Sequence, residues 1–268
     1  MEIRTADLQN MDGEGAEAQN EKILTIALDV GEQILMCGGE VSRVEDTIQR
    51  ICAGYGAGRT DVFAITSSIV VTMHRGGGCV TQTRRINGSE TDFSRMEALN
   101  ALSRRICSER PDTETVQQEL KIISVGNRQG VFPGLSGYLL GSGSFAVFFG
   151  GSVRDGICAM LCGILIFFMD RRVRRIWDSR LLYAMLCSFL AGVCALIFDR
   201  MGLCRDVDKV MIGDIMLLIP GIALTNALRD LFMGDTISGL LRLLEALLQA
   251  AAIACGFALA IYLGGVFA

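Results

Sequence analysis

Five stretches with few charges fill the second half of the chain, and they constrain its fold more than any other feature. They run from about Gln129 to Val153, Gly156 to Met169, Leu181 to Phe198, Val210 to Leu228 and Ile237 to Phe267. A helix that crosses a bilayer needs roughly 20 mostly apolar residues. The few charges available could not cover so many apolar segments in water. The sequence therefore predicts about five transmembrane helices, although the shortest run would also suit a buried helix of a soluble all-α protein.

The first half of the chain is polar by contrast. Residues 1–128 carry 19 of the 29 acidic and 14 of the 25 basic residues. We expect residues 1–20, which are acidic and poor in large apolar groups, to form a disordered tail. The predicted fold class is an α+β cytoplasmic domain (residues 21–128) followed by an all-α membrane domain of about five transmembrane helices (residues 129–268).

Local patterns support the α+β prediction. Apolar residues recur at helical spacing over Lys22–Cys37 and stop at Gly38-Gly39, and Ser42 followed by Glu45 is typical of a helix start. Further helices are expected over Asp92–Ser108 and Asp112–Ser124. Two strands, about Val62–Met73 and Cys79–Ile86, are predicted on either side of a triple-glycine turn.

The arginines set the expected orientation. The loop between residues 170 and 180 holds Arg171, Arg172, Arg174, Arg175 and Arg180. Positively charged loops stay on the cytoplasmic side, so this loop and the polar first half are predicted to be cytoplasmic. Five spans would then leave the C-terminus on the opposite side.

Polar residues within the last two apolar stretches carry the functional information. Pro220-Gly221 should break the fourth helix, because proline lacks a backbone donor, and a broken helix lining a cavity is expected there. Asn226, Arg229 and Asp230 share one helical face. A polar stripe follows at spacings of three and four residues: Asp235, Ser238, Arg242, Glu245 and Gln249.

Such a stripe suits a solute pathway. Ionisable groups at membrane depth are costly and usually mark ion or substrate routes. Arg229 or Arg242 could bind a substrate carboxylate, and Asp230, Asp235 or Glu245 could bind an amine or carry a proton. The alternative is that the stripe marks only the membrane interface, with Arg242 snorkelling and Asp235 capping the helix.

Other kinds of chemistry have little support. The chain has one histidine, His74, no GxxxxGK[ST] phosphate loop and no cysteine spacing typical of zinc. A net charge of -4 argues against nucleic-acid binding. We therefore expect neither an enzyme nor a metal or cofactor site.

Three segments resemble the N-terminal-type subunit of the threonine/serine exporter family: ALDVGEQILMCGGEVSRVE from Ala27, TSSIVVT from Thr66, and PGIALTNALRDLFMGDTISGLLRLLEA from Pro220. The resemblance implies secondary, ion-driven export, from the bacterial inner membrane, of threonine and serine, or of dicarboxylates such as succinate in relatives with split genes. It also implies a small membrane partner subunit that supplies a second membrane unit, and an oligomeric assembly.

The resemblance carries over to two sets of residues. By resemblance, the expected substrate and ion pathway comprises Pro220, Gly221, Thr225, Asn226, Arg229, Asp230, Gly234, Asp235, Ser238 and Gly239. The polar stripe adds Arg242 and Glu245 to it. The motif of the cytoplasmic domain comprises Gly31, Gly38, Glu40, Arg43, Glu45 and Asp46, which could form a gate or contact the membrane unit. The alternative function is a membrane-anchored sensor or assembly protein whose cytoplasmic domain binds a ligand.

Overall fold

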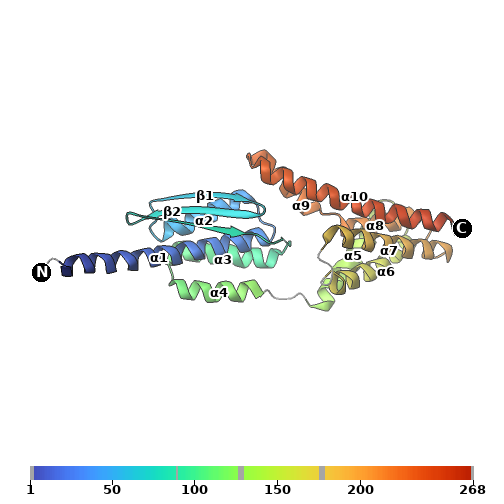
Figure 1. The fold of residues 1–268 in the computed structure, drawn as a ribbon. Coiled ribbons are helices and arrows are strands. Elements are labelled where there is room, and N and C mark those ends of the chain that lie inside the picture. Colours follow the sequence, from blue (N-terminus) through green and yellow to red (C-terminus); the bar gives the residue numbers. More distant parts are fainter. Residues whose placement is uncertain (1–2, 89, 126–129, 175–178, 267–268) are drawn as a thin grey trace. The chain divides into compact units, whose positions relative to one another are not determined.

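The computed structural model describes residues 3–88, 90–125, 130–174 and 179–266 (Figure 1). Within these residues the protein is 74% helical, with ten helices and one small sheet of three strands. The chain divides into two compact units. Residues 1–127 and 222–243 form the first unit, and residues 128–221 and 244–268 form the second.

The first unit begins with helices α1 (Ile3–Met36) and α2 (Val41–Gly54), which are followed by the sheet and by α3 (Phe93–Glu109) and α4 (Thr113–Val125). Figure 1 shows the sheet lying against α1 and α2. The apolar residues predicted at helical spacing in α1, from Ile23 to Leu35, are buried in its core. Their burial against α2 and the sheet drives the assembly of this unit.

The sheet has three antiparallel strands in the order β1 (Arg59–Ile65), β2 (Ser68–Arg75) and β3 (Gly78–Arg85). The prediction of one long strand over Val62–Met73 was wrong, because the chain turns between Ile65 and Ser68. β-branched residues on both sides of this turn favour strands equally, and no glycine or proline marks it. The glycine turn at Gly76-Gly77 is confirmed, with both residues at positive φ.

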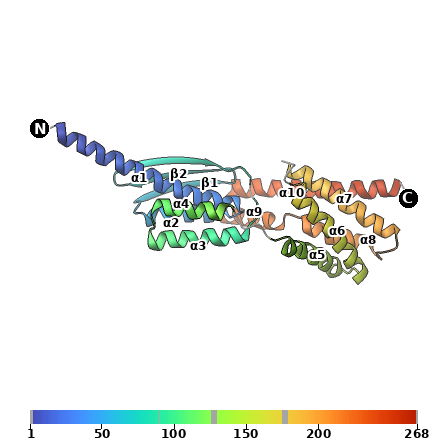
Figure 2. The ribbon, with the colours of Figure 1, turned by 90° about the horizontal axis from the view of Figure 1, so that it is seen from below.

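The second unit contains α5 (Val131–Phe148), α6 (Val153–Arg172), α7 (Arg180–Arg200) and α8 (Val207–Leu218). In Figure 2 these helices appear as a bundle in green to orange. Small residues bring them close together: a Cβ added at Gly213 of α8 would lie 2.5 Å from the carbonyl oxygen of Ser142 in α5. Close approach through small residues is typical of helices that pack in a membrane.

The last two helices are divided between the two units. α9 (Gly221–Met233) follows α8 after a break at Ile219-Pro220, and α10 (Thr236–Val266) follows α9. Residues 222–243 group with the first unit, while the rest of α10 groups with the second. The first unit is thus built from two separate stretches of the chain.

The predicted fold class was wrong. The described residues are mostly helical, and they contain no separate α+β domain that precedes a membrane domain, because residues 222–243 pack with the N-terminal unit. Nor do they contain about five spans. Three helices, α5, α7 and α10, are long and apolar enough to cross a membrane, and the bent pair α8–α9 would make a fourth. α6 is less apolar, because charged residues occupy its first and last turns.

The predicted domain boundaries stay predictions. α1 begins at Ile3 and includes the acidic stretch that the sequence analysis assigns to a disordered tail.

Candidate functional site

The connection between α1 and α2 is a glycine loop whose carbonyl groups are available for binding. Gly38 adopts a positive φ of 83°, and a Cβ at Gly39 would lie 2.6 Å from the Ile34 side chain and 2.8 Å from its carbonyl oxygen. The amides of both glycines close α1 by donating to Leu35 and Ile34. Glycine is thus required at both positions, and the carbonyl oxygens of Gly38 and Gly39 are free to accept hydrogen bonds from other elements.

The α9–α10 corner presents the predicted polar residues. The break at Pro220 separates α8 from α9, which confirms the predicted interruption of the helix. Asp235 lies between α9 and α10, and its amide donates to the carbonyl oxygen of Asp230. Gly239 lies so close to α9 that a Cβ there would lie 2.9 Å from the carbonyl oxygen of Ala227. This close packing brings one face of α9 beside the first turns of α10.

Three side chains of this corner bind the glycine loop and the residue after it. Asn226 donates to the carbonyl oxygen of Gly38 (3.0 Å). Arg242 donates from Nη2 to the carbonyl oxygen of Gly39 (2.6 Å). Arg229 pairs with Glu40, its Nη1 lying 2.7 Å from Oε1. The two sets of residues that the sequence analysis singled out, almost 190 positions apart, therefore meet at one place in the first unit.

Asp230 and Arg242 form the buried centre of this cluster. Arg242 Nη1 lies 3.3 Å from Asp230 Oδ2, and the two side chains are only 11% and 1% exposed. The backbone amide of Val41, the first residue of α2, also faces the Asp230 carboxylate. A buried carboxylate needs such a cation, because an unpaired charge in a low-dielectric interior is very costly. We call Gly38, Gly39, Glu40, Asn226, Arg229, Asp230 and Arg242 the loop–corner cluster.

Glu45 extends this cluster along α2. Its Oε1 accepts a hydrogen bond from the amide of Ala64 in β1 (2.9 Å). Burial raises the pKa of the Glu45 carboxyl group above its ordinary value, the negative charge of Asp235 raises it further, and the bond from Ala64 opposes the shift. The predicted motif residue Glu45 and the predicted pathway residue Asp235 are thus electrostatic neighbours.

Several predicted residues lie outside the cluster. Arg43 and Asp46 are exposed, and Asp46 pairs with Arg50 one turn away. Gly31 lets α1 pack on α2, since a Cβ there would lie 2.6 Å from Ile48. Ser238 is buried, whereas Thr225 and Glu245 are exposed. Pro220 and Gly221 lie at the break between α8 and α9, and Gly234 lies between α9 and α10 at positive φ.

The predicted polar stripe is therefore divided between the two units. Asp235 and Arg242 belong to the first unit, while Gln249 lies in the second, where its side chain donates to the carbonyl oxygen of Leu218 (3.3 Å).

The second unit contains two buried acids that the sequence patterns do not single out as site residues. Asp155 is 1% exposed and binds the connection between α7 and α8, because its Oδ1 accepts from the amides of Arg205 (2.6 Å) and Asp206 (3.0 Å). Asp214, in the middle of α8, is fully buried. In the sequence, Asp214 could have been identified as an isolated acid within an apolar run.

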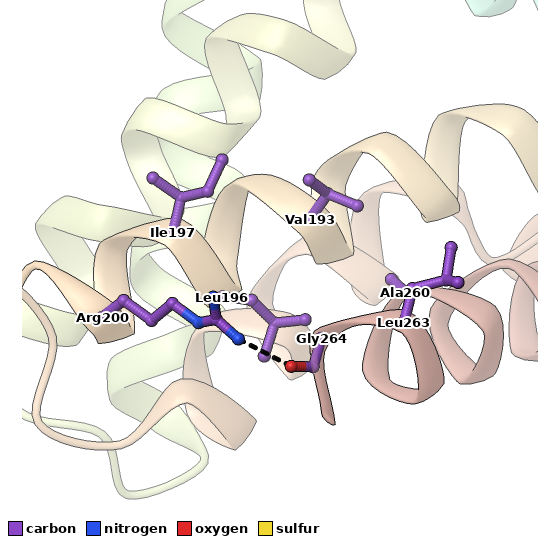
Figure 3. Close-up of a pocket in the computed structure, with 7 residues that line it drawn as sticks. All are labelled: Val193, Leu196, Ile197, Arg200, Ala260, Leu263 and Gly264. Atoms are coloured by element: carbon purple, nitrogen blue, oxygen red, sulfur yellow. Dashed lines mark hydrogen bonds between the residues drawn. The ribbon is translucent and has the colours of Figure 1, made fainter. Parts of the chain in front are cut away.

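An apolar hollow also lies in the second unit, between α7 and the end of α10 (Figure 3). It has a volume of about 270 Å³. Arg200 borders it and donates to the carbonyl oxygen of Gly264 (2.7 Å). Leu196, Ile197 and Leu263 make the lining apolar, so the hollow lacks the polar groups that a hydrophilic solute would need.

The loop–corner cluster has the groups required to recognise a small charged solute. It holds two guanidinium groups, two carboxylates, an amide and backbone carbonyl oxygens. Within the described residues, no group of three or more histidine, cysteine or acidic side chains could hold a metal ion. Ionic groups on helices of a chain with several apolar spans are typical of membrane proteins that move solutes.

The apolar helices define the class to which the chain belongs, that of multi-pass membrane proteins. Residues 25–264 match the model of the ThrE family, whose description is "Putative threonine/serine exporter". The match covers most of the chain, so the protein belongs to this family of membrane exporters. No curated protein and no solved structure matched.

Proposed function

We propose that this protein is a subunit of a secondary, ion-coupled exporter. It moves threonine and serine, or a dicarboxylate such as succinate, out of the cell together with a small membrane partner subunit. The observation that carries the proposal is the buried Arg242–Asp230 pair, joined to the glycine loop, in a member of an exporter family. A guanidinium group and a carboxylate side by side match the two charges of an amino acid.

The arrangement of the loop–corner cluster supports a gating role. Asn226 and Arg242 bind the glycine loop through its carbonyl oxygens, and Arg229 holds Glu40. A solute carboxylate would compete with Asp230 and Glu40 for the two arginines, and an ammonium group would compete with the arginines for the acids. Solute binding would in this way release the loop from α9 and α10, which links occupancy to a change in conformation.

The proposal includes an orientation. The arginine-rich segment between residues 170 and 180 faces the cytoplasm, together with the N-terminal residues of the first unit, in a bacterial inner membrane. Accessibility of a cysteine introduced at Arg59, an exposed residue of the first unit, in a variant whose own ten cysteines are replaced by serine or alanine, would test this. Labelling of that cysteine in intact cells by a reagent that cannot cross the membrane would contradict the orientation.

The experiment that tests the function measures efflux of preloaded labelled threonine, serine and succinate. Cells would express this chain alone, and together with the small membrane protein encoded beside it. Efflux that requires both proteins is the expected result. In that background Arg229→Ala and Asp235→Asn should abolish efflux while the protein still reaches the membrane. Arg59→Ala, which removes an exposed arginine of β1, is the matched control and should leave efflux unchanged.

Either of two outcomes would contradict the proposal. Full efflux in both variants would show that the transport site includes neither Arg229 of the loop–corner cluster nor its neighbour Asp235. If none of the three solutes moved although both proteins were in the membrane, the exporter assignment would fail for these solutes. A sensor or assembly role would then be favoured.

A further inference from the structure

Asp214 is a fully buried acid in the second unit that no part of the loop–corner cluster uses. It lies on α8, which packs against α5, α6 and α7. Its side chain is 0% exposed. Neither of its carboxyl oxygens has a nitrogen or oxygen hydrogen-bond partner within the described residues, and the Cys162 thiol beside it is only a weak donor. A buried polar group in this state is unusual and calls for a functional explanation.

The groups that face Asp214 are weakly polar. The thiols of Cys162 on α6 and of Cys194 and Cys187 on α7 are the titratable groups that interact with it. From α5, the helix against which α8 packs most closely, no charged side chain is available, since residues 131–148 contain none. Thiols are weak hydrogen-bond donors and do not compensate a carboxylate charge.

Among the described residues, no lysine or arginine is one of the groups that interact with Asp214, including Lys209 five positions earlier in α8. The charged residues of α6 and α7 occupy the ends of these helices, as Arg154 and Asp170 show for α6. Cys162 lies halfway between those two residues, roughly 12 Å from each along the helix axis at 1.5 Å per residue. An ionised carboxylate in such a place, without a counter-charge, would be strongly destabilising. In this arrangement Asp214 is therefore accommodated as a neutral carboxyl group.

We propose that Asp214 is the proton-binding group of the exporter. This inference rests on the proposed function and names its coupling ion. In the step that we envisage, the Asp214 carboxylate takes one proton from water on one side of the membrane and becomes a neutral carboxyl group. It later releases the same proton to water on the other side, and no electron changes place. The packed arrangement of α5 to α8 holds the neutral form.

Because Asp214 is fully buried, the gain or loss of its proton requires a change in conformation. Gly213, its neighbour in the chain, lies against the backbone of Ser142 and Ala146, and Asp214 itself is fully buried, so bulk water does not reach its carboxyl group. The charged form needs water or a cation, so proton loss requires α8 to move relative to α5, α6 or α7. Such a linkage between protonation and helix packing is what an alternating-access transporter requires.

A spectroscopic experiment tests proton binding without any transport. The purified protein in lipid would be titrated while infrared difference spectra record the carbonyl stretch of protonated carboxyl groups. We expect a carbonyl band at neutral pH that disappears in Asp214→Asn. Asp208→Asn, the same change at an exposed position of α8, is the control and should keep the band. An identical band in Asp214→Asn would overturn the proposal.

A transport experiment tests the coupling itself. Proteoliposomes that contain both subunits would be assayed for solute movement driven by a pH gradient, and for exchange of labelled against unlabelled solute without a gradient. If one proton moves with each solute molecule, a gradient of one pH unit can sustain about a tenfold ratio of solute concentrations across the membrane. Asp214→Asn should lose this acceleration but keep exchange, whereas Asp208→Asn should keep both. Gradient-driven transport that persists in Asp214→Asn would overturn the proposal.

The two experiments separate the possible failures. If the wild-type protein moves no solute, the proposed function fails, while the infrared band still decides whether Asp214 holds a proton. If the wild-type protein transports solute and the Asp214→Asn protein responds to the gradient in the same way, only the proton site fails.

Discussion

Loss of the Arg242 side chain should destabilise the protein strongly, because it would leave Asp230 buried without its cation. Asp230 is 1% exposed and Arg242 is 11% exposed, so water cannot replace the missing partner. Breaking one half of a buried ion pair costs about 3 to 5 kcal/mol. At roughly 2 to 4 °C per kcal/mol for a chain of this size, Arg242→Ala should lower the melting temperature by roughly 6 to 20 °C.

A double-mutant cycle isolates the pair from the other contacts of Arg242. Arg242→Ala also removes the hydrogen bond to the carbonyl oxygen of Gly39, but this loss is the same whether residue 230 is aspartate or asparagine. In the Asp230→Asn background no charge is left unpaired, so Arg242→Ala should cost less by at least about 1 kcal/mol. The difference between the two backgrounds measures the interaction of Arg242 with Asp230.

The assay is thermal stability of the purified protein in a mild detergent, followed as the loss of the monodisperse peak in size-exclusion chromatography. Arg50→Ala is the matched control, because Arg50 also pairs with an acid, Asp46, but the two side chains are 71% and 54% exposed. An exposed pair contributes at most about 1 kcal/mol, so its melting temperature should fall by no more than roughly 4 °C. Equal losses for Arg242→Ala in both backgrounds would refute the argument from burial.

Two further predictions concern single residues of each unit. Since the pKa of Glu45 is raised, its contribution to stability is complete below the ordinary pKa and is lost as the pH rises through the folded-state pKa. The melting temperature of the wild type minus that of Glu45→Gln should therefore decrease as the pH is raised from about 4 to about 8, a range that begins near the ordinary pKa of a glutamate. A difference that does not depend on pH would contradict this. Gly213→Ala should destabilise the protein by about 1 to 3 kcal/mol, because the added Cβ meets the α5 backbone. In the same melting assay Gly265→Ala, on an open surface of α10, should be neutral or slightly stabilising, and equal effects of the two would show that the close contact is not there.

Local patterns predicted much of what the residues do by themselves. The apolar spacing and the glycine pair located the end of α1, and Pro220 located the break between α8 and α9. The spacing of Asn226, Arg229 and Asp230 placed them correctly on one face. These features depend on backbone stereochemistry and on residues a few positions apart, so they can be read from the chain directly.

Errors arose where a short turn or a distant contact decided the outcome. The turn between β1 and β2 contains Thr66-Ser67, and threonine also favours strands. The grouping of residues 222–243 with the N-terminal unit could not be inferred from composition, because most of these residues belong to two of the apolar stretches that predict spans. That grouping changed the predicted fold class, whereas the charged first and last turns of α6 reduced the number of spans.

The amino-acid sequence by itself determined that this is a membrane protein with a polar first half, and it identified the residues of two motifs in a family of exporters. Only the tertiary structure decided that the two motifs meet, with Arg242 and Asn226 bound to the glycine loop. It also decided that Asp230 and Asp214 are buried. The physical reason is that burial and pairing depend on which helices pack together, and that depends on contacts between residues far apart in the chain.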